Sequence, residues 1–502
     1  MVEKSGAQMK IKRWLSSNTF FLVLLLAISA YTWRLLPEQV IRGDGFVYLI
    51  SETQRDFFDR DFFYTGFELS AVSFGWLFSR LYGITISWYW WIAYIIMLVT
   101  HAMFYALALT IFKKPILAFV ASVIFALNYF GNWDIYSSHC YCFFLERIIP
   151  VLFLLPAAVY LHRFLEKGKR REGIFSIILY VLGVGLGHWS VFIAAFFSFY
   201  PVCWALFRRR KQVENWLLGT TFFVITIFFV LVQQIHESGL GPDWSAINFL
   251  FHPEVYLWPQ KILHQFVYWT QYPLIVSHFY NLRRLQPETS DLHALEVMTP
   301  YIVTLYVLAF YMIFHNLPKY RALLVTAIIG TISIFYVNAF FGQYDVLYQP
   351  GANRYLYYPT MLLSLFWTLF IGTVINRREK LLKGIVVMIF IGYIVINIAL
   401  VRESYIETMG HNAWTKKVYE YIQLNTWFLE KDTLIIAPYD EVGVYEAIFF
   451  TEQLSSRGVK VMSAYNTYPE TDTWERTASG SAHVIMLTKN KACRCIEEII
   501  LR

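Results

Sequence analysis

The chain has 502 residues, of which 57% are hydrophobic, 19% aromatic and only 15% charged. Soluble domains carry about 25% charged residues, so this composition excludes an ordinary soluble protein and predicts a polytopic α-helical membrane protein in a lipid bilayer. The net charge of +7 does not indicate a nucleic-acid partner, because the basic residues lie in short clusters between apolar runs, as they do in membrane proteins.

A helix needs about 20 apolar residues to cross a bilayer, and the sequence offers eleven such stretches. They are residues 18–36, 86–112, 116–131, 145–165, 173–187, 189–207, 216–235, 298–315, 321–341, 358–376 and 383–401. The segment 67–82 is apolar but short and interrupted by serine and glycine. It is expected to form a helix in, or dipping into, the membrane interface.

Alternate loops between these spans are short and basic, which predicts their orientation because cytoplasmic loops carry an excess of lysine and arginine. The basic clusters lie at residues 113–114, 167–171, 208–211, 319–321 and 377–383. The pattern predicts a cytoplasmic N-terminus and an extracytoplasmic C-terminus, in the plasma or inner membrane or, in a eukaryote, the endoplasmic reticulum. Four segments then face outward, at residues 37–85, 128–144, 236–297 and 342–357.

The sequence changes character after about residue 404, which predicts a membrane domain over 1–403 and a small soluble α/β domain over 404–502. Buried strands are expected at 433–438, 459–463 and 483–487, with helices at 414–429 and 445–454. Strands that alternate with helices indicate a mostly parallel sheet. With a C-terminus outside, this domain would be extracytoplasmic.

The first outer segment opens on Arg42-Gly43-Asp44-Gly45-Phe46-Val47-Tyr48 and is dense in acids and bases, Arg60 among them. Charged groups next to lipid are costly unless they are used or paired. Asp44 lies between two glycines, which allow the backbone to approach a substrate closely, and its carboxylate could take a proton from an attacking hydroxyl. A plain loop turn explains Gly-Asp-Gly equally well.

Other ionisable residues of the outer segments are candidates for substrate binding. Arg354 lies in Asn353-Arg354-Tyr355-Leu356-Tyr357-Tyr358-Pro359 before the tenth span, and its planar guanidinium suits a phosphate. An interfacial arginine that reaches toward the headgroups is the alternative. The remaining candidates lie in or next to the outer segment 128–144 and are Asp134, His139, Glu146 and Arg147. They could serve as a second acid and a phosphate contact, or pair structurally with another loop.

The pattern resembles the GT-C superfamily of polyprenyl-phosphate-dependent membrane glycosyltransferases, which includes the protein O-mannosyltransferases and the lipid A aminoarabinose transferases. The residues that carry the resemblance are Asp44 in the Arg42 to Tyr48 stretch and Arg354 in the Asn353 to Pro359 stretch. The resemblance implies a many-span fold with a soluble domain after the last span, Asp44 as the catalytic base and Arg354 on the donor phosphate. An Asp-Asp or Asp-Glu pair is missing at Asp44, so the use of a divalent metal stays open.

Together these features predict an inverting glycosyltransferase that moves a sugar from a polyprenyl-phosphate donor to a hydroxyl of a protein, lipid or glycan acceptor. Asp44 would be the general base, and the other substrate-binding candidates are Arg354, Arg147, Arg60, Tyr48, Tyr355, Asp134, Glu146 and His139. A polysaccharide polymerase or O-antigen ligase is the nearest alternative, since it also uses lipid-linked sugars. A transporter or a non-catalytic scaffold is the alternative from another class, although transporters place their charges at the bilayer midplane.

Overall fold

Helices dominate the structure, which is a computed structural model. The residues that it describes are 17–42, 46, 49–50, 69–129, 132, 141, 144–186, 193–208, 212–238, 262–263, 265–266, 269–270, 289–340, 356–376, 379–425, 428–438, 442–463, 481, 483–490 and 495–500. Contacts divide the chain into two compact units. One comprises Met1–Trp33, Met97–Trp133 and Pro150–Val401, and the other Arg34–Ile96, Asp134–Ile149 and Arg402–Arg502.

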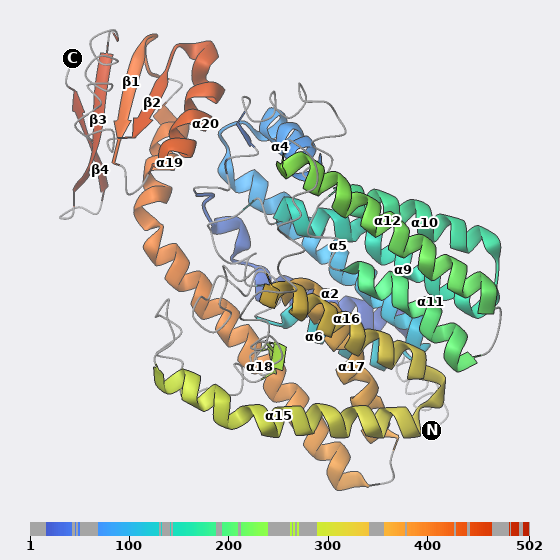
Figure 1. Cartoon of the computed structure of the whole chain (residues 1–502). Coiled ribbons are helices and arrows are strands. Elements are labelled where there is room, and N and C mark those ends of the chain that lie inside the picture. Colours follow the sequence, from blue (N-terminus) through green and yellow to red (C-terminus); the bar gives the residue numbers. More distant parts are fainter. Residues whose placement is uncertain are drawn as a thin grey trace, which may run out of the picture. The chain divides into compact units, whose positions relative to one another are not determined.

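A helix is present at each of the eleven stretches expected to span the membrane (Figure 1). They are α2 (Asn18–Trp33), α5 (Ile86–Phe112), α6 (Pro115–Leu127), α9 (Ile149–Lys167), α10 (Arg170–Leu186), α11 (Ala194–Arg208), α12 (Gln212–Ser238), α15 (Thr289–Asn316), α16 (Arg321–Phe340), α17 (Tyr357–Ile375) and α18 (Lys380–His411). Seven helices in the described part of the chain are long and apolar enough to cross a membrane. The chain is therefore a polytopic helical membrane protein, and the number of its spans stays a prediction, as does the boundary at residue 403.

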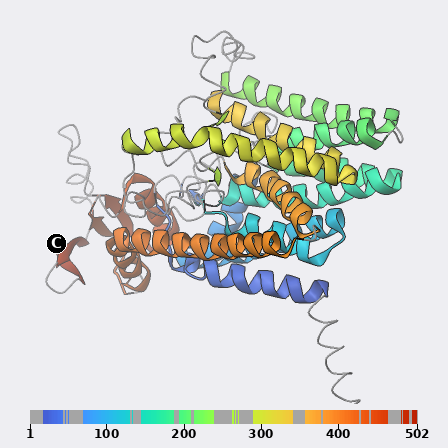
Figure 2. The same ribbon diagram turned by 90° about the horizontal axis from the view of Figure 1, so that it is seen from below.

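Within the first unit, α11 packs against both α12 and α16, and α10 packs against α12. These neighbouring helices run alongside one another in Figure 1 and again in the turned view of Figure 2. The approach of α12 to α11 is close at Gly219, where an added Cβ would lie 2.7 Å from the backbone oxygen of Ser198. Small residues at membrane helix interfaces allow such an approach, because packing replaces the hydrophobic effect between helices in lipid.

The change Gly219→Ala is expected to destabilise the first unit, because a backbone oxygen cannot move aside as a flexible side chain can. Overpacking of this kind costs roughly 1–3 kcal/mol. Gly392→Ala on α18 is the matched control, since nothing lies within 4 Å of the added Cβ and alanine favours a helix over glycine by about 1 kcal/mol. Thermal unfolding in detergent should place Gly219→Ala below the wild type and Gly392→Ala at or above it. The reverse order would contradict this packing.

Helix α6 has only 13 residues, so it is about 20 Å long and shorter than the ~30 Å hydrocarbon core. Carbonyl groups at its C-terminal end receive hydrogen bonds from side chains of other helices. Trp33 Nε1 of α2 donates to Ala126 O at 3.2 Å, and the Tyr393 hydroxyl of α18 donates to Ile124 O at 3.1 Å. Backbone groups at membrane depth need such partners because water is absent there.

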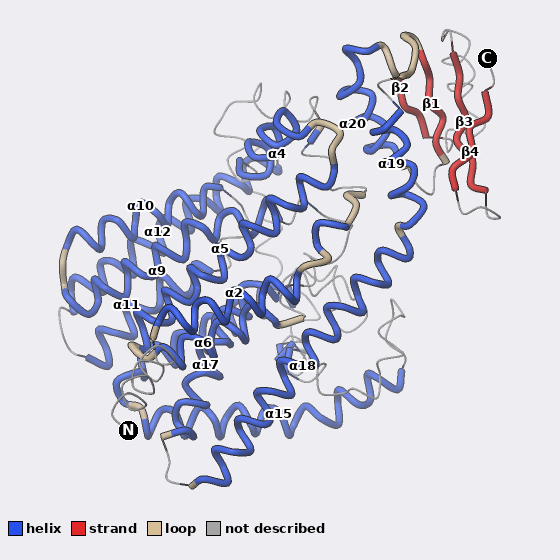
Figure 3. Tube along the Cα trace, turned by 180° about the vertical axis from the view of Figure 1, so that it is seen from behind, coloured by secondary structure: helices blue, strands red, loops and turns tan. Residues whose placement is uncertain are grey.

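The second unit contains a four-stranded sheet, drawn in red in Figure 3, in the order β2-β1-β3-β4. Its strands are β1 (Thr433–Ala437), β2 (Lys460–Ser463), β3 (His483–Asn490) and β4 (Cys495–Ile500). β1 runs parallel to both β2 and β3, with Ile435 opposite Val461 and Ile485. All five residues of β1 are buried, as a central strand requires.

The three expected strands and both expected helices of this segment are present, the helices as α19 (Ala413–Asn425) and α20 (Val444–Leu454). The structure adds β4, an edge strand antiparallel to β3 that the sequence did not predict. Its residues Glu497 to Ile500 are exposed, so it lacks the continuous apolar run that identifies a buried strand. Helix α4 (Leu69–Tyr82) forms within the segment 67–82. Its expected position in the membrane interface stays a prediction.

Candidate functional site

The first outer segment enters the second unit along a buried path. After α2 comes the short helix η1 (Leu36–Glu38), and the next residues, Gln39, Val40 and Ile41, are all buried. The Tyr419 hydroxyl of α19 donates a hydrogen bond to Ile41 O at 3.0 Å. A helix of the C-terminal segment therefore fixes the backbone three residues before Asp44.

The residues on either side of the Gly43-Asp44-Gly45 triplet are also held by C-terminal helices. Arg42 Nη1 donates to Asn412 Oδ1 at 3.2 Å. Phe46 is fully buried, and its ring centroid lies 4.9 Å from that of Phe449 on α20. Asp44 itself lies outside the described residues, but both its flanks have fixed positions within this unit.

Phe46 belongs to a cluster of aromatic rings, which we call the aromatic cluster. Its members are Phe46, Tyr89, Trp90, Tyr141, Phe144, Tyr419, Phe449 and Phe450. Successive centroids lie 4.9 to 6.5 Å apart along the path Phe46, Phe449, Tyr89, Tyr141 and Phe144. Aromatic pairs at such distances contribute about 0.5–1.5 kcal/mol beyond the area that they bury. The cluster thus joins the first outer segment, the start of α5, the second outer segment, α19 and α20.

Tyr141 links the second outer segment, residues 128–144, to this cluster. Its hydroxyl donates to Tyr89 O at 3.1 Å. Burial raises the pKa of the Tyr141 phenol well above its usual value, and the neighbouring Tyr89 and Tyr82 raise it further. The phenol therefore keeps its proton at physiological pH and remains a donor, as a link to a carbonyl group requires.

Arg147 lies in a π-helical turn, η3 (Phe144–Ile148), that packs against α4 within the same unit. Its side chain is only 3% exposed. An arginine cannot lose its charge in a protein, and a buried charge is tolerated when anionic or polar groups surround it. Single π-helical turns occur frequently at functional sites. A guanidinium held here could neutralise an anionic substrate group.

The structure describes the Arg147 side chain and the backbone of Glu146, which lies in the same turn. The other candidates lie outside the described residues, and they are Asp44, Tyr48, Arg60, Asp134, His139, Arg354 and Tyr355. Sequence reasoning missed Asn412, Tyr419 and Phe449, which hold the flanks of Asp44. Their side chains are ordinary helix residues in the sequence, and no local signal could have identified them.

Within the described ranges, no group of three or more His, Cys, Asp or Glu side chains lies close enough to hold a metal ion. The use of a divalent metal, left open by the sequence, stays open.

Comparisons with known proteins add one structural likeness. No protein-family model and none of the curated proteins matches this sequence. Among solved structures, the chain is similar to the crystal structure of ArnT from Cupriavidus metallidurans bound to undecaprenyl phosphate. The TM-score is 0.45 at 12% sequence identity, and the match covers 94% of each chain. A likeness at this level assigns no function, so the functional argument rests on the residues of this chain.

Proposed function

We propose that the protein is a GT-C-type membrane glycosyltransferase that transfers a sugar from a polyprenyl-phosphate donor to an acceptor hydroxyl on the extracytoplasmic face. The observation that carries the proposal is the anchoring of Arg42 and Phe46 around an acidic residue between two glycines. A loop turn without a function needs no such support on both sides. A general base does, because catalysis depends on a fixed geometry between the base and the reacting hydroxyl.

In this proposal Asp44 removes the proton of the acceptor hydroxyl as the hydroxyl oxygen attacks the anomeric carbon of the donor sugar. The bond from that carbon to the phosphate oxygen breaks, and polyprenyl phosphate leaves with the electron pair. Attack from the face opposite the phosphate inverts the anomeric configuration. General-base catalysis by a positioned side chain contributes typically 10²- to 10⁴-fold to a rate.

Arginine side chains would hold the donor phosphate and stabilise the charge that develops on it. Arg354, Arg147 and Arg60 are the candidates, since a guanidinium donates two parallel hydrogen bonds to a phosphate. Fixed positive groups that face the leaving group supply electrostatic stabilisation, a role that a divalent metal could share. The sugar and the acceptor would contact the remaining candidates, which are Tyr48, Tyr355, Asp134, Glu146 and His139.

The purified protein, incubated with a panel of radiolabelled polyprenyl-phosphate sugars and with crude membrane acceptors, should release free polyprenyl phosphate from one donor class. Transfer of a single sugar would support the proposal, whereas transfer of a long preassembled glycan would favour a polymerase or ligase. A folded protein that releases no polyprenyl phosphate from any donor would contradict the proposal.

A further inference from the structure

Three basic residues gather where α11 ends and α16 begins, next to the short helix η9 (Pro318–Tyr320). They are Arg208 in the last turn of α11, Lys319 in η9 and Arg321 at the start of α16. We call this group the cationic junction. It lies in the first unit, whereas the anchors of Asp44 belong to the second.

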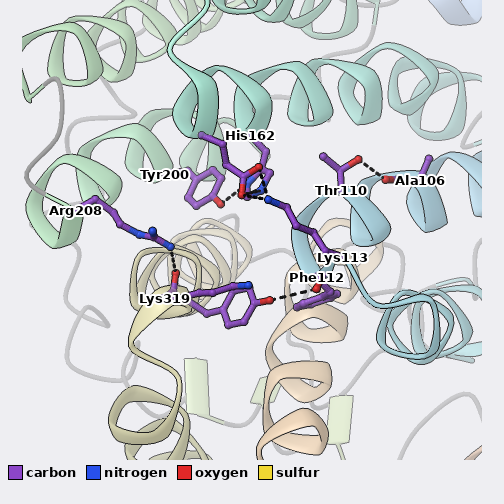
Figure 4. A network of polar contacts seen from close by, with 10 residues as sticks. Ala106, Thr110, Phe112, Lys113, His162, Tyr200, Arg208 and Lys319 are labelled. Atoms are coloured by element: carbon purple, nitrogen blue, oxygen red, sulfur yellow. Dashed lines mark hydrogen bonds and ion pairs between the residues drawn. The ribbon is translucent and has the colours of Figure 1, made fainter.

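Arg208 is held in place by neutral groups. Its Nη2 donates to Lys319 O at 2.8 Å, a contact drawn in Figure 4. Its guanidinium carbon lies 4.7 Å from the centroid of the Trp204 ring. Stacking over an aromatic face orients a guanidinium without neutralising it, so the positive charge of Arg208 remains available.

The other two cations are held in the same way. Lys319 Nζ lies 4.7 Å from the centroid of the Tyr320 ring. Arg321 Nε donates to Phe314 O at 2.8 Å, and its guanidinium carbon lies 4.5 Å from the centroid of the Phe314 ring. Across the part of the chain that the structure describes, no carboxylate lies within ion-pair distance of the three cations.

A neighbouring lysine shows the contrast. Lys113 Nζ lies 2.6 Å from a carboxylate oxygen of Glu166, and Figure 4 draws Lys113 together with Arg208 and Lys319. The Tyr320 hydroxyl, next to Lys319, donates to Phe112 O at 3.4 Å and connects the two places. One cation at this end of the helices is thus paired with a carboxylate, while none of the described carboxylates pairs with the three cations of the junction.

We propose that the cationic junction binds the phosphate of an anionic phospholipid headgroup. The planar guanidinium of arginine matches the geometry of a phosphate. Basic pockets between membrane helices bind such headgroups. Tryptophan and tyrosine favour the headgroup level of a bilayer, so Trp204 and Tyr320 would keep the cations at that depth. The adjoining Leu206 and Phe207 are 59% and 39% exposed. They offer apolar surface for an acyl chain, which favours a lipid over free phosphate.

Native mass spectrometry of the full chain in detergent, titrated with phosphatidylglycerol or phosphatidylcholine, tests this site. The wild type should bind phosphatidylglycerol in preference to phosphatidylcholine. The double variant Arg208→Gln/Lys319→Gln should bind phosphatidylglycerol about 30-fold more weakly, because two basic residues near the membrane surface are lost. The single variant Lys319→Gln, which changes an exposed side chain, should bind about fivefold more weakly. If the double variant does not fold, Lys319→Gln alone serves as the test of the site.

Lys380→Gln/Lys383→Gln is the matched control, since it removes the same charge from the start of α18 and should leave the affinity within about twofold. Equal affinity of wild type and double variant for phosphatidylglycerol would overturn the proposal, as would equal loss in the control. If inorganic phosphate binds as tightly as phosphatidylglycerol, the ligand of the cationic junction is the free anion and not the lipid. These outcomes do not depend on glycosyltransferase activity.

Discussion

Replacement of Asp44 by asparagine is expected to abolish sugar transfer and to leave the protein folded. Asparagine has the same shape as aspartate but cannot accept the proton of the acceptor hydroxyl. A positioned general base contributes typically 10²- to 10⁴-fold to a rate, so kcat should fall by about that factor. The measurement is release of polyprenyl phosphate from the donor identified in the panel, with wild type and Asp44→Asn at equal concentration.

The matched control is Glu38→Gln, which removes a carboxylate from an exposed side chain of η1. Glu38 lies in the same outer segment as Asp44, so each variant removes one negative charge from that segment. Glu38→Gln should keep the wild-type rate, and both proteins should elute at the wild-type volume in size-exclusion chromatography. An Asp44→Asn variant with full activity would remove Asp44 from the mechanism and return it to the role of a turn.

Hydropathy predicted the helices well, because the cost of exposing backbone groups to lipid allows few alternatives to a helix. The residues at which helices end were less predictable where contacts with another part of the chain determine them. Helix α6 ends at Leu127 rather than at the expected residue 131. Its last carbonyl groups are satisfied by Trp33 and Tyr393. Residues on other helices thus permit the helix to end where hydropathy alone would extend it.

The candidate site was predictable only in part. The sequence singled out Arg147 as a candidate for binding, and the structure adds that Arg147 is only 3% exposed. The support of the Asp44 segment was not predictable, since Arg42 and Asn412 are 370 residues apart in the sequence. The local sequence around neither residue indicates that the two side chains form a hydrogen bond. Contacts of that range follow from the folding of the chain and not from a local pattern.

The change Phe46→Ala is expected to lower both the stability and the activity of the protein. Phe46 is fully buried against the rings of Phe449, Phe450 and Tyr419. Truncation of a buried phenylalanine costs about 3–5 kcal/mol, because it loses the transfer free energy of the ring and leaves a cavity. The unfolding temperature should fall clearly below that of the wild type.

Activity should fall further than stability alone explains, because Phe46 lies two residues after Asp44 and fixes one side of the triplet. A displacement of about 1 Å at a catalytic group can cost roughly 100-fold in rate. The rate should be measured well below the unfolding temperature of the variant, so that the folded fraction is close to complete. Phe428→Ala is the control, since its side chain is 85% exposed and its loss should change stability by less than about 0.5 kcal/mol. A Phe46→Ala protein with a lowered unfolding temperature and the wild-type kcat would show that the aromatic cluster supports the fold without positioning Asp44.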